Sequence, residues 1–278
     1  MFTVSVCSQY IGYDYYVSSI IIVDMEGGRH FMTEVGSHVQ IPRLILRNFH
    51  NENNELFYYD VDSKTIKKGH AKTLYREQGY FSGYVEGYLG KTVETPLGKL
   101  VSFLKKAEFK DGENPPLNYI DTAFTYLYSL ISRSPVLLNE INENSSFFQL
   151  LSEQDQHDIA AHDTLIMAKE RGLLGEYRVA FMVNKTFEEM VLPTGGITQY
   201  GSRLICPISP WRALVFDKNI RNISDDENKN FVTLFEVIAS EEIVLINREA
   251  MSQEICRNRK HIVATNRALL ERLLKLAL

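Results

Sequence analysis

The chain has 278 residues, of which 45% are hydrophobic and 23% charged, and its formal net charge is −5. This composition is typical of a folded globular protein, and the acidic balance argues against binding nucleic acid through bulk positive charge. The cysteines Cys7, Cys206 and Cys256 show no Cys-x-x-Cys spacing, which argues against a zinc ribbon or a disulfide framework. No apolar run is long enough to span a bilayer, so we expect a soluble, cytoplasmic protein with no membrane partner.

Two β-hairpins are predicted near the N-terminus. The first pairs residues 17–23 with residues 30–35 across the glycines at 27 and 28, and the second pairs residues 56–61 with residues 65–68. Between the hairpins, Pro42 suits the first turn of a helix because it has no backbone N–H to satisfy. We therefore expect a short helix from Pro42 to Phe49.

The centre of the chain is predicted to be helical, because apolar residues recur there every three or four positions. Helices are expected over residues 84–88, 92–107, 115–131 and 152–171, with a short helix opened by Ser134-Pro135. Glycines and Pro96 indicate a break or kink within the first two. Ser152 is a suitable N-cap for the longest helix and Gly172 a suitable stop.

Beyond residue 177 the hydrophobic period changes to two. Strands of an antiparallel meander are expected over residues 177–183, 189–192, 203–206 and 213–216, and closing helices over residues 227–239, 247–256 and 262–276. The whole chain is thus predicted to be one α+β domain over residues 1–278. It could be subdivided into a β-hairpin region (1–80), a helical layer (81–172) and a meander with closing helices (173–278).

The segment from His38 to Phe49 is the most distinctive part of the sequence. A histidine is followed four residues later by a proline and then by an apolar turn that ends in Asn48-Phe49. Together with Pro207-Ile-Ser-Pro210 and with Asn247 at a helix start, this segment resembles the uncharacterised family named domain of unknown function 4238. An acidic turn typical of that family is replaced here by residues 192–196, which contain no carboxylate. The family has no settled activity to carry over.

His38 is the first candidate catalytic residue, because an imidazole changes charge near neutral pH and can act as a base or a metal ligand. The alternative is that it caps the helix that follows. Arg43 and Arg47 lie one helical turn apart and could grip a phosphate together, with Asn48 as a third candidate substrate-binding residue. Arg257, in the basic stretch of residues 257–261, is a fourth. Solvated surface is the alternative for all of them.

Glu86 and Glu94 complete the candidate catalytic set. With His38 they could form a nuclease-type site in which a divalent metal ion polarises a phosphate group and activates water. The helix that starts at Ser152 offers further ligands, since Asp155, Asp158 and His162 share one face and are compatible with a divalent ion. Charges at the start of a helix also complement its dipole, so the metal and cofactor requirements stay open.

Two functional hypotheses follow. The first is an enzyme acting on phosphate-containing substrates, a nuclease-like effector of a bacterial defence or toxin system, with nucleic acid or a nucleotide as its partner. The second is a non-catalytic binding protein in which the His-x-x-x-Pro motif is structural. In that case aromatic residues of the hairpins contact a partner or a second copy of the chain, as in a homo-oligomer. These residues are Tyr13, Tyr15, Tyr16, Phe57, Tyr58 and Tyr59.

Overall fold

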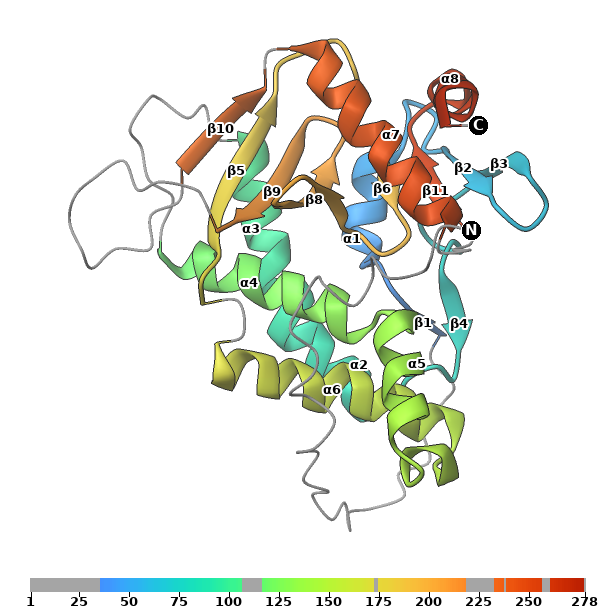
Figure 1. Cartoon of the computed structure of the whole chain (residues 1–278), viewed down its shortest axis with the longest axis vertical. Coiled ribbons are helices and arrows are strands. Elements are labelled where there is room, and N and C mark those ends of the chain that lie inside the picture. Colours follow the sequence, from blue (N-terminus) through green and yellow to red (C-terminus); the bar gives the residue numbers. More distant parts are fainter. Residues whose placement is uncertain are drawn as a thin grey trace.

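The computed structural model describes residues 36–106, 117–172, 175–218, 233–237, 239–256 and 261–277. They form an α+β fold in which a layer of helices lies against two mainly antiparallel sheets (Figure 1). The predicted hairpin over residues 17–35, the aromatic residues Tyr13, Tyr15 and Tyr16, the residue Arg257 and the side chain of His38 lie outside the described part. No helix among the described residues has the length and apolarity that crossing a membrane requires.

The N-terminal elements agree with the predicted helix and second hairpin. Strand β1 (Gly36–His38) pairs with β4 (Arg76–Gln78), which places the backbone of His38 opposite Arg76. Helix α1 (Arg43–Leu46) follows Pro42 and tightens into the 3-10 turn η3 (Arg47–Phe49). Strands β2 (Leu56–Asp60) and β3 (Thr65–Gly69) form the hairpin.

The central helices follow the predicted order. They are α2 (Gly83–Leu89), the π-helical turn η4 (Gly90–Glu94), α3 (Thr95–Lys106), α4 (Leu117–Ser132), α5 (Pro135–Asn144), the 3-10 turn η5 (Phe148–Leu150) and α6 (Glu153–Arg171). The expected break is the π turn η4, which joins α2 to α3 without an intervening loop. Helix α6 begins at the N-cap Ser152 and ends at Gly172, whose φ of 58° is left-handed.

A five-stranded sheet has the order β10-β5-β9-β8-β7. Its strands are β10 (Thr233–Val237), β5 (Arg178–Asn184), β9 (Arg212–Asp217), β8 (Arg203–Ser209) and β7 (Thr198–Tyr200). Only the β10–β5 pair is parallel. Alternate side chains of β5 show how the sheet is covered: Ala180 and Met182 pack in the cluster of α7 (Ser240–Cys256), whereas Val179 and Phe181 pack in that of α3 and α4.

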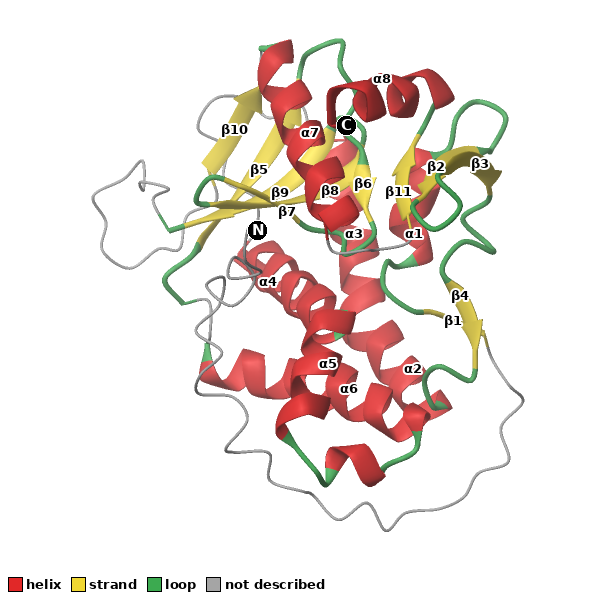
Figure 2. Cartoon of the chain, turned by 45° about the vertical axis from the view of Figure 1, so that its right-hand side comes forward, coloured by secondary structure: helices red, strands yellow, loops and turns green. Residues whose placement is uncertain are grey.

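A four-stranded antiparallel sheet has the order β3-β2-β11-β6, with β11 (His261–Ala264) and β6 (Leu192–Pro193) beside the hairpin. Helix α8 (Arg267–Ala277) covers one face of this sheet, where Leu270 and Leu273 pack with Ile262. Figure 2 shows α7 and α8 on the side of the sheets away from α4 and α6. One hydrophobic cluster extends from Ile41 to Val263 and joins the helical layer to both sheets.

Three of the sequence-based assignments near the C-terminus are corrected. Residues 262–264 belong to strand β11 and not to the predicted closing helix, and residues 233–237 form strand β10 and not part of a helix over 227–239. The predicted strand over 189–192 is reduced to β6. Short apolar runs fit a helix or a strand equally well, and here pairing with β2, β5 and β6 decides in favour of a strand.

Candidate functional site: a polar cleft beside Asn48

A polar cleft of about 860 Å³ opens where segments from distant parts of the chain meet. Its walls come from residues 48–53, 209–212 and 265–266, together with Lys105, Asn184 and Glu189. The cleft therefore lies among the loop after η3, the end of α3, the β8–β9 turn and the junction between β11 and α8. Loops held by a rigid scaffold are the usual location of binding residues.

Asn48 is the predicted site residue that the structure places in this cleft. Its side-chain amide nitrogen donates to the backbone oxygen of Ile208 at 2.8 Å, and its side-chain oxygen accepts from the ammonium group of Lys105. The first motif is thereby joined to the Pro207–Pro210 element, which the family resemblance also singled out. Asn48 holds Lys105 at the cleft, so its role is to position a cation.

Arg212, the first residue of β9, supplies a second cation. Burial lowers the pKa of its guanidinium group, which indicates that the charge is partly removed from water. One terminal nitrogen donates to the backbone oxygen of Trp211 at 3.0 Å, whereas the Nε atom is buried and has no hydrogen-bond partner among the described residues. Because the Nε atom is closed off from solvent, an anionic ligand would contact the terminal nitrogens of this partly desolvated guanidinium.

His50 forms part of the wall beside Asn48. Its Nε2 atom accepts a hydrogen bond from the backbone N–H of Ala71 at 3.2 Å, so the neutral ring carries its proton on Nδ1. Burial lowers the pKa of His50, and the nearby positive groups His70, Arg47 and Arg43 lower it further. The positive charges of Arg43 and Arg47, the two arginines predicted to bind phosphate, therefore act on His50 in the wall of the cleft.

The acidic residue Glu189 lies opposite these groups and is held in place. One oxygen of its carboxylate accepts from the hydroxyl of Thr265 and from the side-chain amide of Asn266. Its backbone oxygen accepts from Asn247 at 2.8 Å, and the oxygen of the same Asn247 side chain accepts from the backbone N–H of Val191 at 2.9 Å. Asn247, named in the resemblance, thus fixes the loop that carries Glu189.

Trp211 presents an aromatic face next to Arg212. It is the only tryptophan of the chain, and 37% of its surface is exposed. The turn that carries it is ordered by a hydrogen bond from its backbone N–H to the hydroxyl of Ser209. Neither Trp211 nor Arg212 was singled out in the sequence. A lone tryptophan directly after the Pro-x-Ser-Pro element was the signal that could have identified this turn.

The predicted catalytic carboxylates lie in the helical layer, away from the cleft. Glu94 ends the π turn η4 and Glu86 lies in α2. Both carboxylates interact electrostatically with the buried Arg133. Burial raises the pKa of Glu94, while Arg133 acts in the opposite direction. Helix α3 separates Glu94 from Lys105 by about 16 Å at 1.5 Å per residue, so Glu94 is not brought together with Asn48.

The ligand cluster predicted on α6 has structural roles instead. Asp158 accepts from the backbone N–H of Ser82 at 2.9 Å and so helps to start α2, and His162 bonds to its neighbour Asp163 at 2.7 Å. Asp155 bonds to the N-cap Ser152. In the part of the chain that the structure describes, no three His, Cys, Asp or Glu residues are grouped as a metal site would require.

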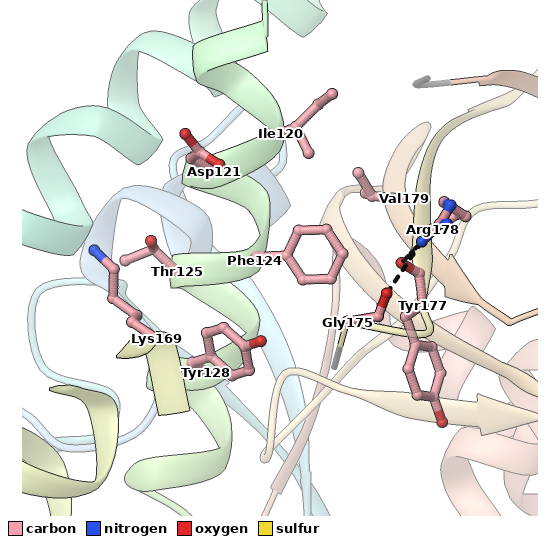
Figure 3. Close-up of a pocket in the computed structure, with 10 residues that line it drawn as sticks. All are labelled: Ile120, Asp121, Phe124, Thr125, Tyr128, Lys169, Gly175, Tyr177, Arg178 and Val179. Atoms are coloured by element: carbon pink, nitrogen blue, oxygen red, sulfur yellow. Dashed lines mark hydrogen bonds between the residues drawn. The ribbon is translucent and has the colours of Figure 1, made fainter. Parts of the chain in front are cut away.

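A second, smaller pocket of about 330 Å³ lies between α4 and β5. Figure 3 shows the ring of Phe124 extending from α4 toward β5, with Arg178 on the opposite side. Arg178 donates to the backbone oxygens of Gly175 and Tyr177 at 3.1 and 3.2 Å. Arg178 thus makes two hydrogen bonds to the backbone, whereas Arg212 makes one. The larger cleft is the better candidate site.

Comparisons of the chain with family models, curated proteins and solved structures give no match. The resemblance to domain of unknown function 4238 consequently stays a prediction. A function has to be argued from the chemistry of the cleft.

Proposed function

We propose that the protein binds a phosphate-containing ligand in the cleft beside Asn48, with Arg212 and Lys105 as its cationic contacts. The observation that carries this proposal is the half-buried guanidinium of Arg212 in the wall of the cleft, which is partly desolvated and makes a hydrogen bond from a terminal nitrogen only to the backbone oxygen of Trp211 among the described residues. A phosphate group in the cleft can accept hydrogen bonds from the terminal nitrogens of the guanidinium, and charge-assisted bonds of this kind are strong where the cation is partly desolvated.

Further groups of the lining suit an anionic ligand, and the carboxylates of Glu52 and Glu189, which also line the cleft, oppose it. Lys105 is a point charge held by Asn48, and the neutral ring of His50 keeps a proton on Nδ1 that it can donate. Arg43 and Arg47 add positive potential from α1 and η3. Trp211 gives the ligand an aromatic face, so a nucleotide, which joins phosphate to a planar base, matches the cleft on both counts.

The second hypothesis, a partner surface on the hairpin, receives less support. Tyr59 is buried, and Phe57 packs against the cluster that includes α8. The ring of Tyr58 lies edge-on against that of His261, with ring centres 4.8 Å apart. These three aromatic side chains serve the cores of the chain itself. A homo-oligomer and a cytoplasmic location remain proposals from the sequence.

The enzymatic form of the first hypothesis is also a proposal. It needs His38, Glu86 and Glu94 near the bound phosphate, and the length of α3 separates Glu94 from the cleft. The cleft supports binding more directly than it supports hydrolysis. The nuclease-like effector is therefore tested separately, by incubating the protein and its Glu94→Gln variant with single-stranded nucleic acid and divalent ions. Cleavage that is abolished in the variant would establish it.

Isothermal titration calorimetry tests the binding proposal. A nucleoside monophosphate should bind the wild-type protein at least tenfold more tightly than the matching nucleoside, a difference of about 1.4 kcal/mol. Arg212→Met should remove this difference, whereas the control Arg178→Met, in the other pocket, should preserve it. Equal affinity of the monophosphate for wild type and Arg212→Met would refute the proposal.

A further inference from the structure

Phe187 is the most exposed large hydrophobic side chain among the described residues, at 99%. It lies in the loop between β5 and β6, and this loop is well ordered by hydrogen bonds to Asn184. The side-chain oxygen of Asn184 accepts from the backbone and the hydroxyl of Thr186 at 3.0 and 2.8 Å, and its amide donates to the backbone oxygen of Glu188 at 2.6 Å. The exposed ring is thus presented by a fixed loop.

The same loop is bonded to the turn that carries Trp211. The backbone N–H of Asn184 donates to the oxygen of Trp211 at 2.9 Å, and that of Met190 donates to the oxygen of Pro210 at 3.0 Å. Arg272 of α8 binds the carboxylate of Glu188 from the other side. Asn184 and Glu189 of this loop also line the cleft. The loop that carries Phe187 and the turn that carries Trp211 therefore belong to one hydrogen-bonded unit, and Asn184, Glu189 and Trp211 of this unit line the cleft.

Four of the five side-chain amides that line the cleft make hydrogen bonds within the protein, and Asn53 is the exception among the described contacts. Asn48 bonds to Ile208 and Lys105, and Asn184 bonds to its own loop. Asn266 donates to Glu189 and accepts from the backbone N–H of Leu269 at 2.8 Å. Reading a base by its edge needs free donor and acceptor groups such as amides. Most of these amides are therefore not free to read a base, whereas Trp211 in the lining and the exposed Phe187 on the adjoining loop can contact its face.

We infer that the ligand is a single-stranded polynucleotide, whose bases stack on Trp211 and Phe187 while its phosphates contact Arg212 and Lys105. This inference rests on the proposed function and names its substrate class. Stacking on aromatic rings beside cations is the general mode of single-strand binding with little sequence preference. In a duplex the faces of the bases are stacked on one another and cannot contact these rings. The two rings and the two cations come from different segments of the chain, so together they match a ligand of more than one nucleotide.

The net charge of the chain restricts how a polynucleotide could bind. A net charge of −5 disfavours coating of a nucleic acid by bulk electrostatics, so binding has to come from a local site. Deoxyribose and ribose strands share the phosphate and base chemistry that the cleft recognises. Both are therefore arms of the test.

Trp211 makes the experiment direct, because its fluorescence is the only tryptophan signal of the chain. Thymidine and uridine homopolymers of about eight nucleotides, a range suited to one binding site, are titrated against the mononucleotides and a duplex. The oligonucleotides should quench Trp211 and bind at least tenfold more tightly than the mononucleotides and the duplex. The difference between the two homopolymers decides whether the natural ligand is DNA or RNA.

Phe187→Ala is the decisive variant. The side chain is fully exposed, so its removal should leave the melting temperature unchanged. It should weaken oligonucleotide binding about tenfold. The matched control is Phe147→Ala, since Phe147 is also exposed, at 46%, but lies in the helical layer between α5 and η5. This control should bind as the wild type does.

The outcomes separate the inference from the proposed function. If mononucleotides quench Trp211 and bind as tightly as the oligonucleotides, the single-strand inference is wrong and the phosphate-binding proposal stands. If neither ligand binds, both are wrong. If Phe187→Ala leaves oligonucleotide binding intact and instead abolishes self-association, the exposed ring serves a contact between copies of the chain and the inference is overturned.

Discussion

Asn48 donates a hydrogen bond to the backbone oxygen of Ile208 at 2.8 Å, across 160 residues of sequence. The same side chain holds the ammonium group of Lys105 at the end of α3. One amide therefore connects η3, α3 and β8 at the point where the cleft opens. The motif that stood out in the sequence is, at this residue, a means of assembling the site.

Removal of this amide should destabilise the fold. Asn48→Ala leaves the oxygen of Ile208 without its partner, and we expect a loss of about 1 to 2 kcal/mol in the free energy of unfolding. The control is Asn144→Ala, because Asn144 is exposed and its amide donates to the backbone oxygen of Glu140 in the same helix. That change should stay within about 0.5 kcal/mol. Equal urea midpoints for the two variants would contradict the structural role of Asn48.

Substitution of Arg212 should weaken ligand binding without lowering stability, in contrast to substitution of Asn48. Because its buried Nε atom has no partner among the described residues, Arg212→Met should leave the free energy of unfolding unchanged or raise it. The same variant should lose affinity for a nucleoside monophosphate by a factor of about ten or more. Urea denaturation and calorimetry on one preparation measure both quantities. A destabilised variant with intact binding would mean that Arg212 is a structural residue.

His50 should make stability depend on pH in the acidic range. Its pKa in the folded protein lies below the ordinary value of 6.5, because of burial and the nearby His70, Arg47 and Arg43. The unfolded chain therefore binds a proton first, and the stability associated with His50 is lost as the pH falls from about 6.5 through the folded pKa. His50→Gln should flatten this part of the stability profile. A profile unchanged by the substitution would count against the neutral, partly buried imidazole.

Glu94 should make stability depend on pH in the opposite direction from His50. Burial raises its pKa above the ordinary value of 4.5, so the folded protein prefers the protonated carboxyl. Its contribution to stability is complete below pH 4.5 and is lost as the pH rises through the folded pKa. Glu94→Gln, which mimics the protonated form, should therefore raise the melting temperature at neutral pH. Glu143→Gln, at an exposed position of α5, is the matched control and should have no effect.

The sequence predicted those elements whose ends carry local signals. Ser152 and Gly172 mark the ends of α6 by an N-cap and by a left-handed residue, both of which act within a few residues. The run Ile262–Ala264 carries no such signal, and its conformation depends on pairing with β2 and β6, which come from elsewhere in the chain. The helix predicted there was wrong for that reason.

The candidate site was predictable only in part. Asn48 belongs to a recognisable motif, and Arg43 and Arg47 next to it do contribute positive potential to the cleft wall. Arg212 is unremarkable in the sequence, because its importance comes from burial and from the loops that surround it, and the one signal at Trp211 is its place as a lone tryptophan after the Pro-x-Ser-Pro element. Contacts between segments as distant as residues 48 and 208 leave no periodic pattern to detect.

Hydrogen–deuterium exchange with and without a nucleoside monophosphate tests most directly whether the cleft is the binding site. Ligand should slow amide exchange in the separate segments that contribute to the lining of the cleft, namely residues 48–53, 209–212 and 265–266 and the positions Asn184 and Glu189. The rest of the described chain should exchange as before. Protection at residues 120–128 and 175–179, around the second pocket, or no protection at saturating ligand, would contradict the account.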